Sequence, residues 1–338
     1  MGILYLSIGT SFLILLIVNI VWLGVNFFFV IVSGLDTILT GNTLVENIYF
    51  STYLKWILTA DVIWIIAGSV FALRRKHYMT DPNFHYLSYR PIENPLVCVI
   101  IPAYNESESI EKVVKDYLGQ KFVKNIIVVD NHSSDDTAII AEKSGAKVIR
   151  KESNTGFGHS TLIGLKAALK TDANIIATTE ADGTFNGYDI AKMIPYMDNS
   201  DMVIGTRQFQ VLTEKGNQNS TMHVWGNFLL AKLIQIKYFS LLHAGVINLT
   251  DVGCLNRMIR REAFEKIIDK CAKPSSNKPL VNDEFALLLT MTGVENNLKI
   301  VEVPVTFNKR IGLSKTGSSQ RRKGIKFGLK FLWFILTR

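Results

Sequence analysis

The chain has 338 residues, is 48% hydrophobic and carries a formal net charge of +8 at pH 7. This length allows one sizeable catalytic core with accessory segments, and the hydrophobic content is high for a wholly soluble protein, so a membrane part is expected. The three cysteines, Cys98, Cys254 and Cys271, are widely spaced and form no C-x-x-C or Cys/His cluster, which argues against a disulfide framework and a zinc site.

Two long apolar runs open the chain. Residues 3–32 contain no charge, and at about 1.5 Å per residue a helix of this length exceeds a hydrocarbon core of about 30 Å. Residues 56–73 form the second run, which is followed by Arg74, Arg75 and Lys76. We therefore expect a transmembrane helical hairpin over residues 1–77, with its basic flank, both termini and the rest of the chain on the cytoplasmic side. Asp61, inside the second run, is interpreted as a polar tie within the helical hairpin, and a functional role is the alternative.

A proline-containing linker over residues 78–95 separates this anchor from a different kind of sequence. Short apolar runs predict strands at residues 96–101, 125–129, 147–149, 174–178 and 202–204, and helical spacing predicts helices at 110–118, 138–143 and 160–169. Strands that are buried on both faces and alternate with helices indicate an α/β domain with a mostly parallel sheet, which we place at residues 96–316.

Polar side chains follow several of these strands at the point where each strand ends. They are Asn105 and Glu106, Asp130, the pair Glu180 and Asp182, and Arg207. A single acid after a strand is usually a helix cap or a turn residue. Four such positions favour a functional site, because the carboxyl ends of parallel strands line one crevice.

Glu180 and Asp182 lie two residues apart, so both carboxylates can reach one cation while Ala181 points away. Oxygen ligands of this kind suit Mg²⁺ or Mn²⁺. Such an ion bridges the phosphates of a nucleotide substrate and stabilises a leaving diphosphate. A solvated turn is the alternative interpretation of this pair.

The motifs taken together resemble a known family. The chain resembles the family 2 glycosyltransferases of GT-A fold in five places. They are Pro102-Ala103-Tyr104-Asn105-Glu106, Asp130, Asn154-x-Gly156-x-Gly158, Glu180-Ala181-Asp182 and Gly205-Thr206-Arg207. Two later segments, Asp251-Val252-Gly253-Cys254-x-x-Arg257 and Arg310-Ile311-Gly312-x-Ser314-Lys315, resemble the polyprenyl-phosphate sugar synthases, the group that includes dolichyl-phosphate mannose synthase.

This resemblance implies a role for each matching residue. Asp182 and Arg207 are implied to act in catalysis, and Glu180 with Asp182 to hold the metal. Binding of the nucleotide sugar is implied for Pro102, Ala103, Tyr104, Asn105, Glu106, Asp130, Gly156, Gly158 and Ala181. Binding of donor and acceptor phosphates is implied for Asp251, Arg257, Arg310, Ser314 and Lys315.

The acceptor could be a polyprenyl phosphate or a hydroxyl group. A phosphate monoester is already charged at neutral pH, its second pKa lying near ~6, so it can attack without a protein base. A hydroxyl acceptor needs a base, and Asp283 and Glu284 are the candidates, although both could instead cap the helix that follows. A catalytically silent membrane scaffold is the third hypothesis, suggested by Glu180 at a position where the family more often has Asp.

Two further segments are candidates for contact with a bilayer. Residues 222–243 are apolar with interspersed lysines, which fits either an interfacial helix or a core helix. In the tail, residues 317–338, five basic side chains precede an apolar run that is too short to span: Arg321, Arg322, Lys323, Lys326 and Lys330. Beside two predicted spans, this basic charge favours an anionic membrane surface over nucleic acid.

Overall fold

The computed structural model describes residues 89–238, 247–272, 283–312 and 321–338, together with scattered positions between residues 17 and 66. The chain divides into two compact units, one formed by Met1–His77 with Ile236–Ala244 and the other by Tyr78–Gln235 with Gly245–Arg338. In the described part, no helix is long and apolar enough to cross a membrane. The two expected spans lie almost wholly outside that part and stay predictions.

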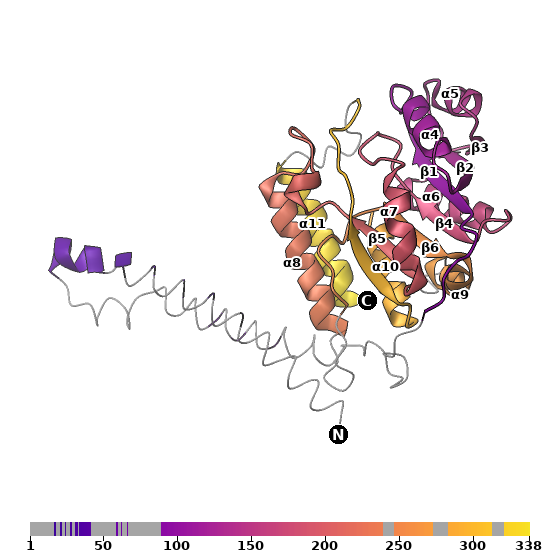
Figure 1. The fold of residues 1–338 in the computed structure, drawn as a ribbon. Coiled ribbons are helices and arrows are strands. Elements are labelled where there is room, and N and C mark those ends of the chain that lie inside the picture. The colour runs from indigo at the N-terminus through magenta and orange to yellow at the C-terminus, as the bar shows by residue number, and fades with distance from the viewer. Residues whose placement is uncertain are drawn as a thin grey trace. The chain divides into compact units, whose positions relative to one another are not determined.

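The second unit is built on a seven-stranded sheet with the order β3-β2-β1-β4-β6-β5-β7 (Figure 1). The strands are β1 Val97–Ala103, β2 Val123–Asp130, β3 Lys147–Arg150, β4 Ile175–Thr178, β5 Met202–Thr206, β6 Arg257–Arg260 and β7 Ile300–Pro304. Every pairing is parallel except those of β6, which runs antiparallel to β4 and β5. The predicted α/β fold with a mostly parallel sheet is confirmed.

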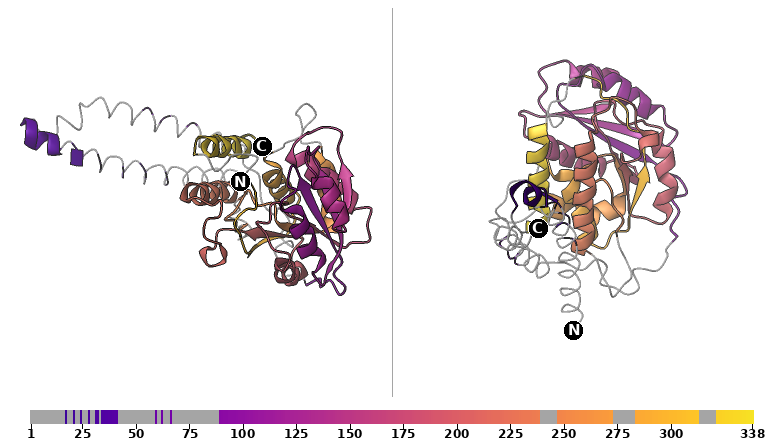
Figure 2. Two further views of the ribbon diagram at one scale, coloured as in Figure 1. Left: turned by 90° about the horizontal axis from the view of Figure 1, so that it is seen from above. Right: turned by 90° about the vertical axis from the view of Figure 1, so that its left-hand side faces the viewer.

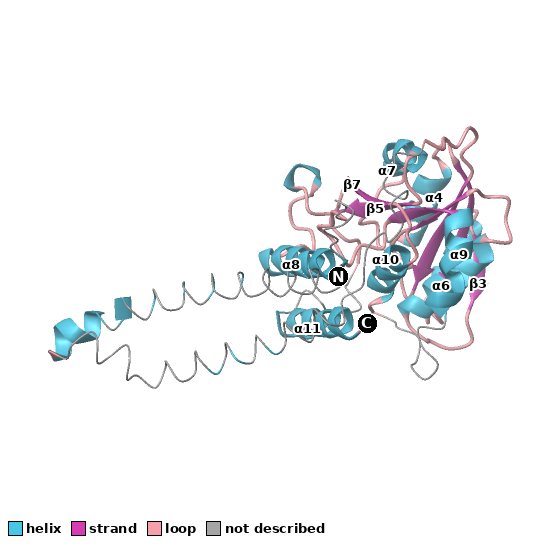
Figure 3. Ribbon diagram, turned by 90° about the horizontal axis from the view of Figure 1, so that it is seen from below, coloured by secondary structure: helices cyan, strands magenta, loops and turns pink. Residues whose placement is uncertain are grey.

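Helices cover both faces of this sheet (Figures 2 and 3). The helices are α4 Ile110–Leu118, α5 Thr137–Lys143, α6 Phe157–Ala168, α7 Asp189–Met193, α8 Thr221–Tyr238, α9 Arg261–Ala272, α10 Phe285–Glu295 and α11 Arg321–Thr337. Short 3-10 turns, η2 Ile194–Asp198 and η3 Gln210–Leu212, follow α7 and β5. Helices α6, α9 and α10 share one face, whereas α4 and α7 lie on the other (Figure 3).

The central strand β1 shows why the sequence folds in this way. All seven of its residues are buried, which a strand covered by helices on both faces requires. On one face, Ile110, Val113, Val114 and Tyr117 form the buried stripe of α4. On the other face α6 approaches very closely, because a Cβ added at Gly164 would lie 2.2 Å from a side-chain atom of Ile100.

The order of the strands locates the crevice. From β1 the chain moves outward to β2 and β3, and α6 then carries it back to β4 on the other side of β1. Because crossovers between parallel strands are right-handed, the helices that lead outward from β1 and the helix α6 that leads back to β4 lie on opposite faces of the sheet. The loops that follow β1 and β4 therefore diverge and leave a crevice between them. Ligands of open α/β sheets bind at this point, outside the carboxyl ends of the strands.

Helix α11 packs along α10 in the same direction. Lys330 Nζ lies 2.8 Å from Asp283 and 3.0 Å from Glu284 at the start of α10, and Arg338 Nη2 lies 3.0 Å from Glu295 at its end. Helices α8 and α11 lie beside the edge of the sheet that is formed by β5 and β7 (Figures 1 and 3). Both carry exposed apolar side chains, among them Trp225, Phe228 and Leu229 on α8 and Ile325, Leu329 and Trp333 on α11.

The eight predicted strands and helices between residues 96 and 206 are all present, with ends shifted by a few residues. The apolar run after Glu284 is also a helix, α10. The elements missed were α7, β6, α9 and β7. Strand β6 is only four residues long and has arginine at both ends, so its alternation is too short to stand out from a loop.

Candidate active site

Three segments that are distant in the sequence meet at the carboxyl end of the sheet. Arg310, which follows β7, donates from Nη1 to Asp182 Oδ2 at 2.6 Å and from Nη2 to Glu106 Oε1. Asp182 follows β4 and Glu106 follows β1, so the guanidinium joins the loops of the two strands that flank the crevice. The side chains of Arg310 and Asp182 are 14% and 3% exposed, so this charge network is largely shielded from water.

The acidic turn after β4 is held firmly. Thr184 donates to Asp182 Oδ1 from both its amide, at 3.1 Å, and its hydroxyl, at 2.6 Å. Ser109 Oγ donates to the carbonyl oxygen of Ala181 at 2.8 Å. Gly183 has a φ of +74°, which other residues rarely adopt. These contacts fix the direction of the Asp182 carboxylate relative to α4 and β1.

Glu180 is partly buried beside Asp182. Burial, followed by the negative charge of Asp182, raises the pKa of Glu180 to about 8, while Arg207 and Arg310 act in the opposite direction. The carboxylate is therefore within electrostatic reach of both arginines. In the part of the chain that the structure describes, no cluster of three or more acidic, histidine or cysteine side chains could hold a metal. Glu180 and Asp182 nevertheless fit Mg²⁺ or Mn²⁺, which are commonly held by one or two carboxylates together with substrate phosphates.

Arg207, at the end of β5, forms a bidentate ion pair with Asp251. Its Nε and Nη2 donate to Asp251 Oδ2 and Oδ1 at 2.7 and 2.9 Å. Burial by itself lowers the pKa of Arg207 and raises the pKa of Asp251. The attraction between the two charges outweighs burial, so the pKa of Arg207 is raised and that of Asp251 is lowered. The ring of Phe307 lies 5.4 Å from the guanidinium carbon. The pair uses Nε and Nη2, so Nη1 takes no part in it.

Asp251 is itself positioned by Glu302 of β7. Glu302 Oε2 accepts from the amide and the hydroxyl of Thr250, both at 2.8 Å, and Oε1 accepts from the amide of Asp251 at 3.1 Å. Sequence reasoning missed Glu302 and Phe307. The available signal was a lone acid inside the apolar strand IVEVP, where a charged residue needs a specific partner.

The segments expected to bind the nucleotide are joined to each other. Asn105, whose φ is +54°, donates its amide to Ser133 Oγ at 2.9 Å and accepts from the amide of Ser134 at 2.8 Å. Asp130 is fully buried, pairs with Ala103 in the sheet register and lies 3.4 Å from Arg150 Nε. The loops after β1 and β2 thus form one continuous edge of the crevice.

The other predicted nucleotide residues lie at the end of β1, at the start of α6 and, for Ala181, in the acidic turn after β4. Pro102 lies inside β1, the side chain of Tyr104 is 37% exposed just beyond it, and Gly156 and Gly158 open α6. Asn131, directly after β2, donates to Asn154 Oδ1 at 2.8 Å and accepts from the amide of Thr155 at 3.2 Å, so the N-terminus of α6 lies at this edge, where helix amides attract anions. The roles of these residues in binding stay predictions.

Among the described residues, two groups of predicted site residues lie apart from this network. Arg257 on β6 is 1% exposed and donates to Ala286 O at 3.0 Å and Thr290 Oγ1 at 3.1 Å in α10, so its side chain points into the core. Burial lowers its pKa to about 10. Asp283 and Glu284 both pair with Lys330. Ser314 and Lys315 lie outside the described residues, and their role in phosphate binding stays a prediction.

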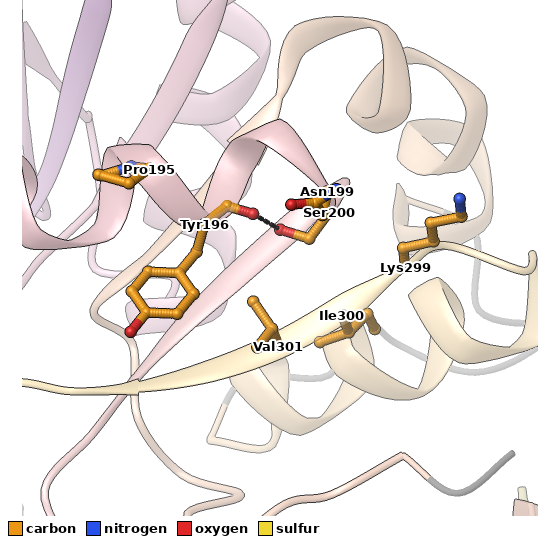
Figure 4. A pocket seen from close by; sticks show the side chains of 7 residues that line it. All are labelled: Pro195, Tyr196, Asn199, Ser200, Lys299, Ile300 and Val301. Atoms are coloured by element: carbon orange, nitrogen blue, oxygen red, sulfur yellow. Dashed lines mark hydrogen bonds between the residues drawn. The ribbon is translucent and has the colours of Figure 1, made fainter. Parts of the chain in front are cut away.

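A shallow cleft of about 450 Å³ lies at the opposite, amino end of β5 and β7 (Figure 4). Its lining comes from η2 and from the first residues of β7: Pro195, Tyr196, Asn199, Ser200, Lys299, Ile300 and Val301. Ser200 Oγ donates to the carbonyl oxygen of Tyr196 at 2.7 Å within the wall. No predicted site residue lines this cleft, and we do not assign it to the reaction.

The crevice, with its acidic turn and its two arginines, defines an α/β transferase fold of GT-A type. Glucosyl-3-phosphoglycerate synthase from Mycobacterium tuberculosis, solved with Mn²⁺, uridine diphosphate and glucosyl-3-phosphoglycerate, shares this fold. It is 19% identical, the match covers 72% of this chain and 80% of that one, and the TM-score is 0.50. A structure of the same enzyme contains Mg²⁺.

The chain belongs to glycosyl transferase family 2, whose family model matches residues 98–268, and it is a glycosyltransferase. The polyprenol monophosphomannose synthase of Mycolicibacterium smegmatis is 28% identical over 244 residues, which cover 70% of this chain and 86% of that protein. The UDP-N-acetylglucosamine--dolichyl-phosphate N-acetylglucosaminyltransferase of Methanococcus voltae is 36% identical over 131 residues, covering 33% of this chain and 52% of that protein. These relatives confirm the resemblance to polyprenyl-phosphate sugar synthases.

Proposed function

We propose that this glycosyltransferase moves a sugar from a UDP- or GDP-linked donor to a polyprenyl phosphate, with inversion at the anomeric carbon. The observation that carries the proposal is the convergence of Glu106, Asp182, Arg310 and the Arg207–Asp251 pair at one end of the sheet. Carboxylates at this crevice suit a cation, and arginines suit phosphates.

Two charges must be balanced during the reaction: that of the departing nucleoside diphosphate and that of the incoming phosphate. A divalent cation on Asp182 and Glu180 would offset the diphosphate charge. Arg207 is suited to the acceptor, because Asp251 binds two of its nitrogens and leaves Nη1 directed elsewhere. An anchored guanidinium loses little freedom when it binds a ligand.

The alternative, a hydroxyl acceptor, needs a free base. Asp283 and Glu284 are the candidates, yet Lys330 lies within 3.0 Å of both carboxylates. An ion-paired carboxylate is a weaker proton acceptor, so this arrangement favours the phosphate acceptor. Substitution of both residues, Asp283→Asn with Glu284→Gln, separates the two readings, because only a hydroxyl acceptor depends on the base.

We also propose that the enzyme is an integral membrane protein, held by two N-terminal spans with its catalytic unit on the cytoplasmic side. The exposed apolar side chains of α8 and α11 and the lysines beside them support contact with an anionic bilayer. Phe331 of α11 and Asn227 of α8 both lie within 3.8 Å of the Cβ position of Gly253, next to Arg207 Nη2. These contacts support a lipid-linked acceptor that approaches the arginine from this surface.

The test is a transfer assay on membranes that contain the full-length protein. Labelled UDP and GDP sugars are supplied with and without polyprenyl phosphate and with and without a chelator. We expect a labelled lipid that needs both the polyprenyl phosphate and the metal. Asp182→Ala should abolish it, whereas Asp172→Ala, which removes an exposed carboxylate paired with Lys124, should leave it intact. A labelled lipid that forms equally with Asp182→Ala would refute the assignment of the site.

A further inference from the structure

Arg310 lies between the carboxylates of the acidic site. Its two terminal nitrogens each bind a different carboxylate, Asp182 through Nη1 and Glu106 through Nη2. One oxygen of Asp182 is therefore taken by the guanidinium, and the other accepts two hydrogen bonds from Thr184. Neither oxygen of this carboxylate is free in the observed arrangement, although it is the one we expect to bind a divalent cation.

A backbone strap, residues 308–312, holds the arginine there. The amide of Asn308 donates to Thr184 O at 2.8 Å, and the amide of Ile311 donates to Asp182 O at 2.9 Å, so the strap pairs with the acidic turn at two points. The side chain of Ile311 lies against Gly183, where an added Cβ would be 2.9 Å away. The guanidinium is thus delivered to Asp182 by main-chain bonds and by close packing.

One hydrogen-bond donor of the Arg310 side chain is not satisfied in this position by any described residue. Its Nε is buried and has no hydrogen-bond partner among the described residues. A buried polar group without a partner costs about 1–3 kcal/mol, so native structures rarely keep one without a reason. A second position of the side chain, in which Nε also finds an acceptor, would remove this cost. A diphosphate offers several oxygens to one guanidinium.

We propose that Arg310 is the internal counter-cation of the site and exchanges partners during the catalytic cycle. In the described arrangement it neutralises Asp182 and Glu106. A divalent cation competes for the same Asp182 oxygen and displaces the guanidinium, which then binds the diphosphate of the donor. The cation therefore binds before the donor. This inference rests on the proposed function, because it takes the metal and the nucleotide sugar as the ligands of the site.

The exchange predicts opposite effects on two ligands. Loss of Arg310 removes a competitor of the metal, so Arg310→Gln should bind Mn²⁺ about tenfold more tightly in the absence of nucleotide, which corresponds to about 1.4 kcal/mol. The same variant should bind uridine diphosphate, or guanosine diphosphate if that is the donor nucleotide, at least tenfold more weakly at saturating Mn²⁺. A purely structural defect would weaken both.

Calorimetric titration of the purified full-length protein measures both affinities. Lys309→Gln is the matched control, because it removes one positive charge from an exposed position next to Arg310 and should change neither affinity. Arg310→Lys keeps the charge but reaches one carboxylate instead of two, so its Mn²⁺ affinity should lie between those of the wild type and Arg310→Gln. This variant keeps the test informative if Arg310→Gln folds poorly.

Two outcomes overturn different statements. Unchanged or weaker Mn²⁺ binding by both Arg310 variants, in a protein whose Mn²⁺ binding is lost in Asp182→Asn, would refute the exchange and leave the proposed metal site standing. Mn²⁺ binding that persists unaltered in Asp182→Asn would refute the metal site itself.

Discussion

The ion pair between Arg207 and Asp251 offers the sharpest test of the site's electrostatics. Asp251 is fully buried and Arg207 is 14% exposed, and two hydrogen bonds of 2.7 and 2.9 Å join them. Removing one partner of a buried pair leaves an uncompensated charge and costs about 3–5 kcal/mol. Loss of Asp251 also relieves its repulsion of Glu302, whose pKa is raised by burial and by that negative charge. We therefore expect about 3 kcal/mol for Asp251→Asn and for Arg207→Gln.

Because the two groups neutralise each other, the double variant should lose much less stability than the sum of the single variants. A coupling of about 2 kcal/mol is expected, within the range seen for residues in one network. The assay is denaturant unfolding of the detergent-purified chain, followed by intrinsic fluorescence and repeated for all four proteins. Stability losses that add to within about 0.5 kcal/mol would show that the pair is not a coupled unit.

Three further predictions concern other parts of the fold. Gly164→Ala should lower the free energy of unfolding by about 1–3 kcal/mol through overpacking against β1, whereas Gly226→Ala in α8, with no described atom within 4 Å of its Cβ, should raise it by up to about 1 kcal/mol. In the metal-free protein the pKa of Glu180 is raised to about 8 from 4.5. Between these values the folded chain retains a proton that the unfolded chain releases, so the free energy of unfolding should fall as pH rises from about 5 to 8. Glu180→Gln should flatten this dependence in urea titrations at several pH values. Lys330→Gln should lower stability by about 1 kcal/mol, because Glu284 is 7% exposed and loses its cation.

A specific result would refute each of these three predictions. Equal unfolding midpoints for the two glycine variants would mean that α6 can move away from the sheet. Superimposable pH profiles for the wild type and Glu180→Gln would mean that the carboxyl titrates at its ordinary pKa. For the helix pair, Lys326→Gln is the control, since Lys326 is exposed on the same helix. An equal effect of the two lysine variants would show that the contact with Glu284 contributes nothing.

The α/β class, and the end of the sheet that carries the site, could be predicted from the amino-acid sequence. Periodicity is a local property, so the fully buried strand 97–103 and the stripe Ile110, Val113, Val114 and Tyr117 were readable from neighbours a few residues apart. The position of polar residues after strands was equally local. Glu106, Asp182 and Arg207 could therefore be singled out, and the family resemblance added Asp251 and Arg310.

Which of these residues meet could not be predicted, because it depends on the three-dimensional fold. Arg310 and Glu106 are separated by 204 positions, and their contact depends on the order of the strands and on the strap after β7. The direction of a side chain could not be predicted either. Arg257 was expected at the phosphates, but its side chain points toward α10. The short antiparallel strand β6 that carries Arg257 was not predicted. Long-range pairing depends on how the whole core packs, and no local window of sequence contains that information.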